Sequence, residues 1–222
     1  MDIKLVVGTW LRFLFSKSFH KKKSKSLLSY FMIPSNNYVN IVCSKMTRSK
    51  IVVSGVGNTI ELETILNKST IQIEGNNNKI IVRRGSQLHS LYLSIAGDNC
   101  VIDIGENVFF HSGFLHSGGK NSLIQIGNDC LFAHDIDIMN SDSHQLLSDG
   151  KEFNYSRDVI IGSHVWVGAH VSIMKGVSIG NNAVIGIRSV VTKDIKDNTL
   201  NAGIPCRLLK EGVNWSMDRN TK

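Results

Sequence analysis

The sequence predicts an all-β fold built from stacked triangular coils. Two repeats indicate it: a strict six-residue period in the second half of the chain, and a longer and looser repeat in the first half. Composition agrees, because 19 glycines, two prolines and only 7% aromatic residues suit small aliphatic cores and repeated turns. A length of 222 residues allows one large domain with an appendage.

The strict repeat places an aliphatic residue at every sixth position. Its members are Ile161, Val167, Ile173, Ile179, Ile185 and Val191. Glycine follows four of them, and the fourth position after each is small or β-branched. A period of six fits neither a 3.6-residue helix nor a simple hairpin. It fits a flat rung followed by a sharp corner, so three hexads form one coil of about 18 residues whose aliphatic side chains stack in a shared core.

The earlier segments repeat less regularly. Asn58, Asn78, Asn99 and Asn121 each precede an alternating apolar stretch, and the spacing between them lengthens slightly along the chain. We interpret each stretch as one coil with a slightly extended corner. Strict hexads begin near Ile104-Gly105 and Ile126-Gly127.

One interruption of the repeat predicts a functional loop. Phe132 and Ile138 are in step, but the next aliphatic partner is Ile161, which indicates that 17 positions are inserted. The predicted loop, about 139–158, contains Ser141-Asp142-Ser143-His144-Gln145. Long loops that project from rigid scaffolds usually carry function.

The sequence divides into a segment 1–49, a repeat domain 50–212 and a tail 213–222. Six apolar residues near the start have helical spacing, so we expect a short N-terminal helix; they are Ile3, Val6, Val7, Trp10, Leu11 and Leu14. We also expect a short helix at Cys206–Glu211. The apolar run 3–15 is too short to span a bilayer, and lysines follow it rather than precede it, unlike a secretory signal.

Charge is concentrated at the N-terminus. Residues 1–25 contain seven Lys or Arg and one acid, and so account for six of the seven net positive charges. Two interpretations remain open: the segment tethers the protein to the inner membrane face, or it caps the first coil. No nucleic-acid-binding motif accompanies the basic cluster, which argues against a nucleic-acid partner. The four cysteines form no CxxC pair, which favours a reducing, cytoplasmic environment.

The chain resembles the hexapeptide-repeat acyltransferase superfamily over about residues 50–212. The likeness rests on the hexads and on Thr192-Lys193-Asp194-Ile195 and Ala202-Gly-Ile-Pro-Cys-Arg207. Within the superfamily it is most similar to O-acetyltransferases of capsules, lipopolysaccharide and other sugars. The resemblance implies a left-handed parallel β-helix, a homotrimer, acetyl-CoA as donor, a carbohydrate acceptor and no metal.

The resemblance also implies roles for residues of the inserted loop. His144 matches the catalytic base of an Asp-x-His-Pro motif, although Gln145 replaces the proline. A hydroxyl nucleophile needs such a base, and imidazoles ordinarily titrate near neutrality. Asp142 would hold the imidazole in one tautomer; a solvated loop aspartate is the alternative. His116 would line the acceptor side, or simply cap a turn.

Trp166 matches a tryptophan that lines the CoA and acceptor pocket. We therefore expect it to serve both as a catalytic-site residue and as a cofactor-binding residue. The alternative is a structural role, in which Trp166 is buried between subunits. The other expected CoA-binding positions are Gly168, Ala169, Ile187, Thr192, Lys193 and Arg207. Ala169 and Ile187 would contribute backbone groups, whereas Lys193 and Arg207 would meet phosphates.

Three other functions remain as alternatives. Zinc-dependent γ-class carbonic anhydrases share the expected fold, and His89, His111 and His116 would be the ligands here. Serine acetyltransferases share the late coils but carry a helical N-terminal domain that is too long for the segment 1–49. A non-catalytic β-helix scaffold is the third.

Overall fold

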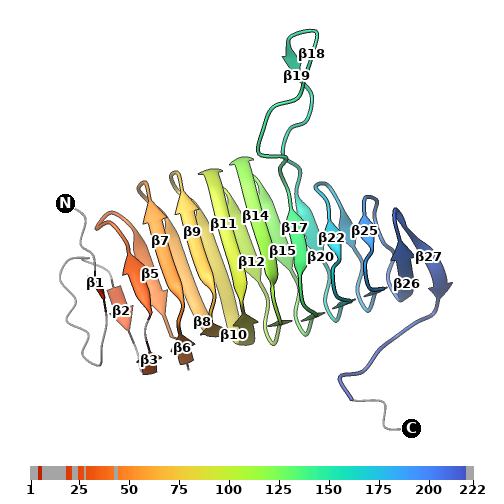
Figure 1. Cartoon of the computed structure of the whole chain (residues 1–222), viewed down its shortest axis with the longest axis horizontal. Helices are drawn as coiled ribbons and strands as arrows, with labels where there is room; N and C mark the ends of the chain where they lie inside the picture. The colour runs from red at the N-terminus through yellow and green to blue at the C-terminus, as the bar shows by residue number, and fades with distance from the viewer. Residues whose placement is uncertain (1–4, 7–18, 22–24, 28, 43–44, 219–222) are drawn as a thin grey trace.

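The structure, a computed structural model, describes residues 5–6, 19–21, 25–27, 29–42 and 45–218. It is a left-handed parallel β-helix in the form of an elongated three-sided prism, with the N-terminal coils at one end and the C-terminal coils at the other (Figure 1). No helix occurs among the described residues, and none of them forms a helix able to cross a membrane.

One sheet forms the first face of the prism. Its strands, in spatial order, are β1 (Leu5–Val6), β4 (Tyr30–Met32), β7 (Lys50–Ser54), β9 (Thr70–Glu74), β11 (Leu91–Asp98), β14 (Gly113–Lys120), β17 (Ile136–Met139), β22 (Ser172–Ile173) and β25 (Val190–Val191). All neighbours in this sheet are parallel except β1 and β4.

A second sheet wraps around the other two faces, because its strands β8 (Thr59–Asn67) and β10 (Lys79–His89) each run across both. The second face contains β2 (Phe19–Lys21), β5 (Tyr38–Ile41), β12 (Val101–Ile104), β15 (Leu123–Ile126), β20 (Val159–Ile161) and β23 (Ser178–Ile179). The third contains β3 (Lys25–Leu27), β6 (Lys45–Thr47), β13 (Phe109–Phe110), β16 (Leu131–Phe132), β21 (Trp166–Val167), β24 (Val184–Ile185), β26 (Thr199–Gly203) and β27 (Cys206–Glu211).

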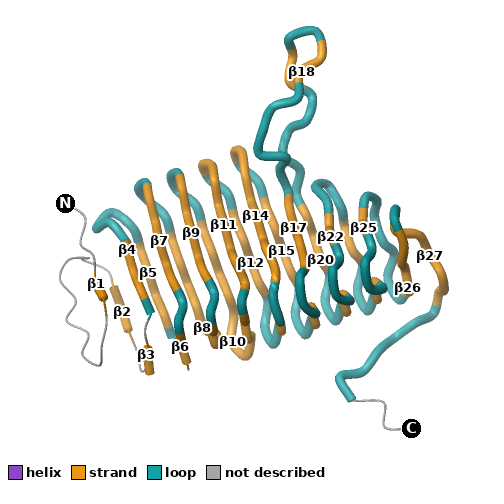
Figure 2. The backbone as a smooth tube through the Cα atoms, in the orientation of Figure 1, coloured by secondary structure: helices purple, strands orange, loops and turns teal. Residues whose placement is uncertain are grey.

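The coils shorten along the prism. In the first half Val101 pairs with Leu123, whereas in the second half Trp166 pairs with Val184, so each later coil uses fewer residues. The longer strands of the first half and the short rungs of the second are both visible in Figure 2. The step from Trp166 to Val184 equals three hexads, so the coil predicted from the hexads is confirmed.

Aliphatic side chains fill the interior. Each of the six hexad residues from Ile161 to Val191 is almost completely buried in one continuous core. The aromatic members stack in the same way: the rings of Phe110 and Phe132, one coil apart, lie parallel with centroids 4.0 Å apart. Burial of such side chains is the main stabilising contribution to a solenoid.

The asparagine repeat has a different register from the predicted one. Asn58 and Asn78 are buried, and Asn58 Oδ1 accepts the Asn78 backbone N–H at 2.9 Å. Asn99 and Asn121 instead take the left-handed corner position one residue earlier, with φ near +55°. The strand register shows that Asn77, with φ +54°, is equivalent to these two residues. Asparagine recurs at this corner because it tolerates the left-handed conformation better than most residues.

The inserted loop lies where the sequence places it. Leu131 pairs with Trp166, and Trp166 pairs with Val184 in the following coil, so the first of these two steps is 17 positions longer than the second. The loop leaves the prism after β17 and ends in a small hairpin of β18 (Leu147–Ser148) and β19 (Lys151–Glu152), which stands away from the coils (Figure 1).

Both expectations about the ends of the domain need correction. The helix predicted at Cys206–Glu211 is wrong: this segment is β27, antiparallel to β26, because it closes the open edge of the last coil. The boundary at residue 50 is too late, since β4, β5 and β6 already pair in parallel with β7 and β8. The N-terminal stripe lies mostly outside the described residues; Leu5 and Val6 are in a strand.

Candidate active site

A buried asparagine anchors the inserted loop. Asn140 follows β17 and is completely buried. Its Oδ1 accepts the Gly118 N–H at 3.0 Å, and its Nδ2 donates to Ser117 Oγ at 3.0 Å. At the other end of the loop, the Arg157 N–H donates to the Asn140 carbonyl oxygen at 2.9 Å. One residue therefore fixes both ends of the loop to the prism.

His144 lies on the exposed part of this loop. Its backbone N–H donates to the Asp142 carbonyl oxygen at 2.7 Å, which makes a tight turn. Asn154, on the part of the loop that returns to the prism, donates through Nδ2 to the His144 carbonyl oxygen at 2.9 Å. The backbone of His144 is held in place while its imidazole is left accessible to a substrate.

Asp142 makes contacts other than the expected one. Its carboxylate accepts hydrogen bonds from Lys175 Nζ and, at 2.7 Å, from Asn154 Nδ2. These two donors hold the pKa of Asp142 below its usual range, with Lys175 having the larger effect. Lys175 also donates to the Asn154 carbonyl oxygen at 2.8 Å. Asp142 thus ties the loop to the coil that carries Lys175, and its carboxylate is hydrogen-bonded to Lys175 and Asn154 rather than to His144.

His116 lies at the foot of the loop rather than at a turn. It is in β14 and only 8% exposed. Its Nδ1 is 3.3 Å from Ser94 Oγ, and its Nε2 is 3.3 Å from Ser143 Oγ, the residue before His144. Burial lowers the pKa of His116, so the ring is neutral near pH 7. Sequence reasoning missed its link to Ser143, because the contact depends on register between residues that are distant in the chain.

Trp166 begins β21 on the third face and is 41% exposed. The C-terminal tail returns to it: Trp215 stacks on His164 with centroids 4.4 Å apart, and its ring lies 6.0 Å from that of Trp166. Trp215 Nε1 donates to the His164 carbonyl oxygen at 2.7 Å. This part of the tail is therefore fixed against the coils, and it adds a second indole to the surface around Trp166.

The expected CoA-binding positions fall into two groups. Ala169 and Ile187 occupy the same position on successive coils, at the corner between the third and first faces, and His134 occupies it one coil earlier. Gly168 precedes Ala169; a Cβ there would lie 2.8 Å from the Ile187 backbone nitrogen, so glycine permits the close stacking. Ile187 is exposed and Ala169 is buried.

The second group lies at the C-terminal end of the prism. Lys193 and Arg207 line one cavity of about 270 Å³, together with Lys196 from the same end. Thr192, directly before Lys193, is exposed. Asp194 also lines this cavity, so its charged lining is three cationic side chains and one carboxylate; the cationic excess suits a phosphate group.

The three histidines of the carbonic anhydrase alternative do not form a group among the described residues of the chain. His89 and His111 are neighbours at the corner of the third face, where burial and then the proximity of His111 lower the pKa of His89. His116 is on the first face. Among the described residues, the histidines that do meet a carboxylate are His134 and His170, which lie beside Asp135.

Comparison with known proteins agrees with the fold. The bacterial transferase hexapeptide model (six repeats) matches residues 158–193. The polysialic acid O-acetyltransferase of Escherichia coli O1:K1 is 33% identical over 90 residues, which are 40% of this chain and 29% of that protein. The sequence alignment thus spans less than a third of that relative's length.

Two solved structures are similar over much more of the chain. The polySia-specific acetyltransferase NeuO covers 93% of this chain and 92% of its own, with 28% identity and a TM-score of 0.72. The polysialic acid O-acetyltransferase OatWY covers 77% of this chain and 93% of its own, with 31% identity and a TM-score of 0.62. The chain therefore belongs to the hexapeptide-repeat acyltransferase superfamily.

Proposed function

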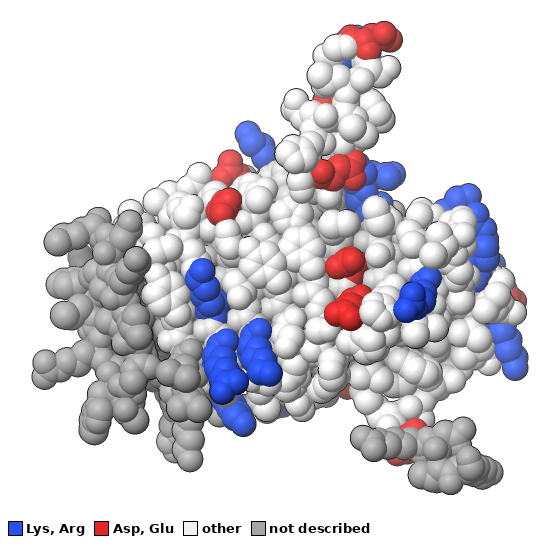
Figure 3. All heavy atoms as spheres, in the orientation of Figure 1, with Lys and Arg blue, Asp and Glu red and all other residues white. Residues whose placement is uncertain are grey.

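We propose that this chain is an acetyl-CoA-dependent O-acetyltransferase whose acceptor is a hydroxyl group of an anionic capsule polysaccharide. The observation that carries the proposal is the likeness to NeuO along nearly the whole chain, combined with a His-bearing loop inserted into the repeat. NeuO and OatWY act on polysialic acid, a polymer of carboxylate-bearing sugars. Lys and Arg side chains gather near both ends of the face in Figure 3, where a polyanion could bind.

In the proposed reaction, His144 removes the proton from an acceptor hydroxyl as its oxygen attacks the carbonyl carbon of the acetyl thioester. The tetrahedral intermediate collapses, the C–S bond breaks, and the imidazolium returns the proton to the CoA thiolate. The acetyl ester and free CoA are the products. The thiolate is a good leaving group, so the step needs neither a metal nor a covalent enzyme intermediate.

The chemistry requires a second subunit in our proposal. His144 projects from the edge between the first and second faces, whereas Trp166, Ala169 and Ile187 lie on or beside the third. The loop also exposes Leu146, Leu147, Phe153 and Tyr155, each at least half exposed. Exposed apolar side chains on a projecting hairpin favour burial against a partner. We propose a homotrimer in which the loop of one subunit meets the third-face corner of the next.

The donor would lie along that corner. The row of Ala169 and Ile187 offers backbone groups to pantetheine, Trp166 packs against the arm, and the cavity of Lys193 and Arg207 receives phosphate. We place the enzyme in the cytoplasm, where acetyl-CoA is available. Whether residues 1–25 contact the membrane or cap the first coil is tested by co-sedimentation of full-length and 26–222 protein with anionic liposomes.

The test of the activity is CoA release from acetyl-CoA with a panel of polysialic acid, neutral capsule polymers and free sugars. We expect turnover with polysialic acid after EDTA treatment and a loss of about 10²- to 10⁴-fold in kcat for His144→Ala, with acetyl-CoA affinity retained. Turnover with none of the acceptors, or a His144→Ala variant with most of its kcat, contradicts the proposal.

A further inference from the structure

Two histidines and one aspartate meet at the corner between the third and first faces, where His134 is one coil before Ala169 in the row along which the donor is proposed to lie. Asp135 Oδ2 lies 3.1 Å from His134 Nδ1 and 3.6 Å from His170 Nδ1. One ligand atom from each residue lies within 4.8 Å of the other two. Asp135 and His170 occupy the same corner position of successive coils, both with φ +57°, so the fold itself places them side by side.

These separations suit metal coordination. Zinc binds imidazole nitrogen and carboxylate oxygen at about 2.0–2.2 Å, so tetrahedral neighbours lie about 3.4 Å apart. The two distances to Asp135 bracket that value. The two imidazoles, whose centroids are 4.8 Å apart and whose planes are nearly perpendicular, must move slightly closer. They can do so, because about half of the His134 side chain and 40% of the His170 side chain are exposed.

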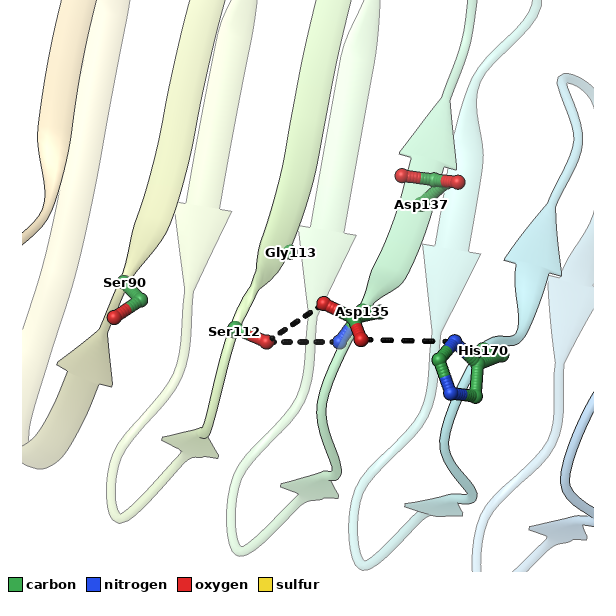
Figure 4. Close-up of a pocket in the computed structure, with 6 residues that line it drawn as sticks. All are labelled: Ser90, Ser112, Gly113, Asp135, Asp137 and His170. Atoms are coloured by element: carbon green, nitrogen blue, oxygen red, sulfur yellow. Dashed lines mark hydrogen bonds and ion pairs between the residues drawn. The ribbon is translucent and has the colours of Figure 1, made fainter.

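The carboxylate is positioned by a neighbouring hydroxyl. Ser112 Oγ donates to Asp135 Oδ1 at 3.2 Å and accepts the Asp135 backbone N–H at 2.9 Å (Figure 4). Oδ1 is therefore occupied, and Oδ2 is the oxygen directed to the histidines. Such outer hydrogen bonds orient metal ligands in proteins.

An open cavity adjoins the cluster. It has a volume of about 500 Å³ and is lined by Asp135, His170, Ser112 and Asp137, with Ser90 and Gly113 from the earlier coils (Figure 4). A metal ion held by three protein ligands would keep a coordination position for water or an oxygen ligand on this side. Arg188 takes the corner position of the next coil, so the row of Asp135 and His170 is followed by a cationic residue.

We propose that His134, Asp135 and His170 bind one Zn²⁺ ion, or a divalent ion of similar preference. Two imidazoles and a carboxylate favour such ions over Mg²⁺ or Ca²⁺, which prefer oxygen ligands. The site differs from the His89, His111 and His116 set considered above. Its three ligands take no part in the proposed proton transfer or thioester cleavage, so ion binding can be tested separately from the acetyltransferase assignment, even though the cluster lies at the corner along which the donor is proposed to bind.

The test is calorimetric titration of Zn²⁺ into untagged, chelator-stripped full-length protein. We expect one ion per chain, and a loss of affinity of about 100-fold or more in His170→Ala, since even supporting residues change affinity by about 10–100-fold. Ser112→Ala should weaken binding by about tenfold without removing a ligand. The matched control is His111→Ala, an exposed histidine of the preceding coil, which should bind as the unmodified chain does.

Spectra with Co²⁺ provide a second readout, because tetrahedral coordination by protein ligands gives d–d absorption that is much more intense than that of the hydrated ion. Unchanged Zn²⁺ affinity in both His170→Ala and His134→Ala overturns the proposal, as does a loss confined to His111→Ala. Far-UV circular dichroism and the urea midpoint show whether each variant is folded; we expect no change, because all the substituted histidines are at the surface.

Discussion

Replacing Asn140 by alanine should destabilise the protein at the point where the loop leaves the prism, although the backbone hydrogen bond from Arg157 remains. The side chain is completely buried, and the Gly118 N–H has its carboxamide oxygen as acceptor. Without that oxygen the buried Gly118 N–H has no acceptor, which costs about 1–3 kcal/mol of stability. The lost bond to Ser117 adds about 1 kcal/mol, since Ser117 Oγ keeps Ser122 Oγ at 3.1 Å as a partner. We therefore expect a loss of about 2–4 kcal/mol in the free energy of unfolding.

Urea unfolding of Asn140→Ala measures this loss directly, provided that the slope of the transition is unchanged. The matched variant is Asn154→Ala, which removes the contacts to Asp142, His144 and the Leu146 N–H from a partly exposed position on the same loop. It should change the free energy of unfolding by less than about 0.5 kcal/mol while lowering turnover. A loss below about 0.5 kcal/mol in Asn140→Ala would refute the anchoring role.

Three further substitutions test the site. Lys175→Met should raise the pKa of Asp142 toward its ordinary value, measured by carbon-detected NMR; an unchanged pKa means that Lys175 does not hold this carboxylate. The pKa of His116 is lowered in the folded protein, so the unfolded chain binds the proton more readily. The folded state therefore loses stability as the pH falls below about 6.5, the ordinary pKa of histidine. His116→Gln should therefore lose less stability between pH 7.5 and 5.5 than the unmodified chain; an equal loss argues against this titration. Trp166→Ala should raise the KM for acetyl-CoA several-fold with the urea midpoint retained, because the indole is partly exposed; unfolding would assign it a structural role instead.

The repeat predicts most of the fold because solenoid packing is local. Each aliphatic hexad residue contacts its equivalent one coil away, so the period, the coil length and the position of the inserted loop all follow from sequence. The backbone conformation at the corners is harder to predict from sequence. Asn77 and Asn78 are adjacent, and only the backbone shows that Asn77 is the left-handed residue and Asn78 the buried one.

Contacts made across the loop could not be predicted. The Lys175–Asp142 ion pair joins residues that are distant in the chain, and no local pattern distinguishes it from a carboxylate paired with the nearby His144. The strand at Cys206–Glu211 could not be predicted for a similar reason: its alternation is too weak to distinguish a strand from a helix, and the open edge of β26 decides its conformation. The packing of Trp215 on His164, still further apart in the chain, depends on that same edge.

The most direct test of the proposed function is transfer of the labelled acetyl group from ¹³C-acetyl-CoA to polysialic acid, followed by NMR of the polymer. The proposal predicts new O-acetyl resonances with the unmodified chain and only background signal with His144→Ala at equal concentration and equal trimer content. Label that stays in acetyl-CoA or appears only as free acetate, or O-acetyl signals of equal intensity from both proteins, would contradict it.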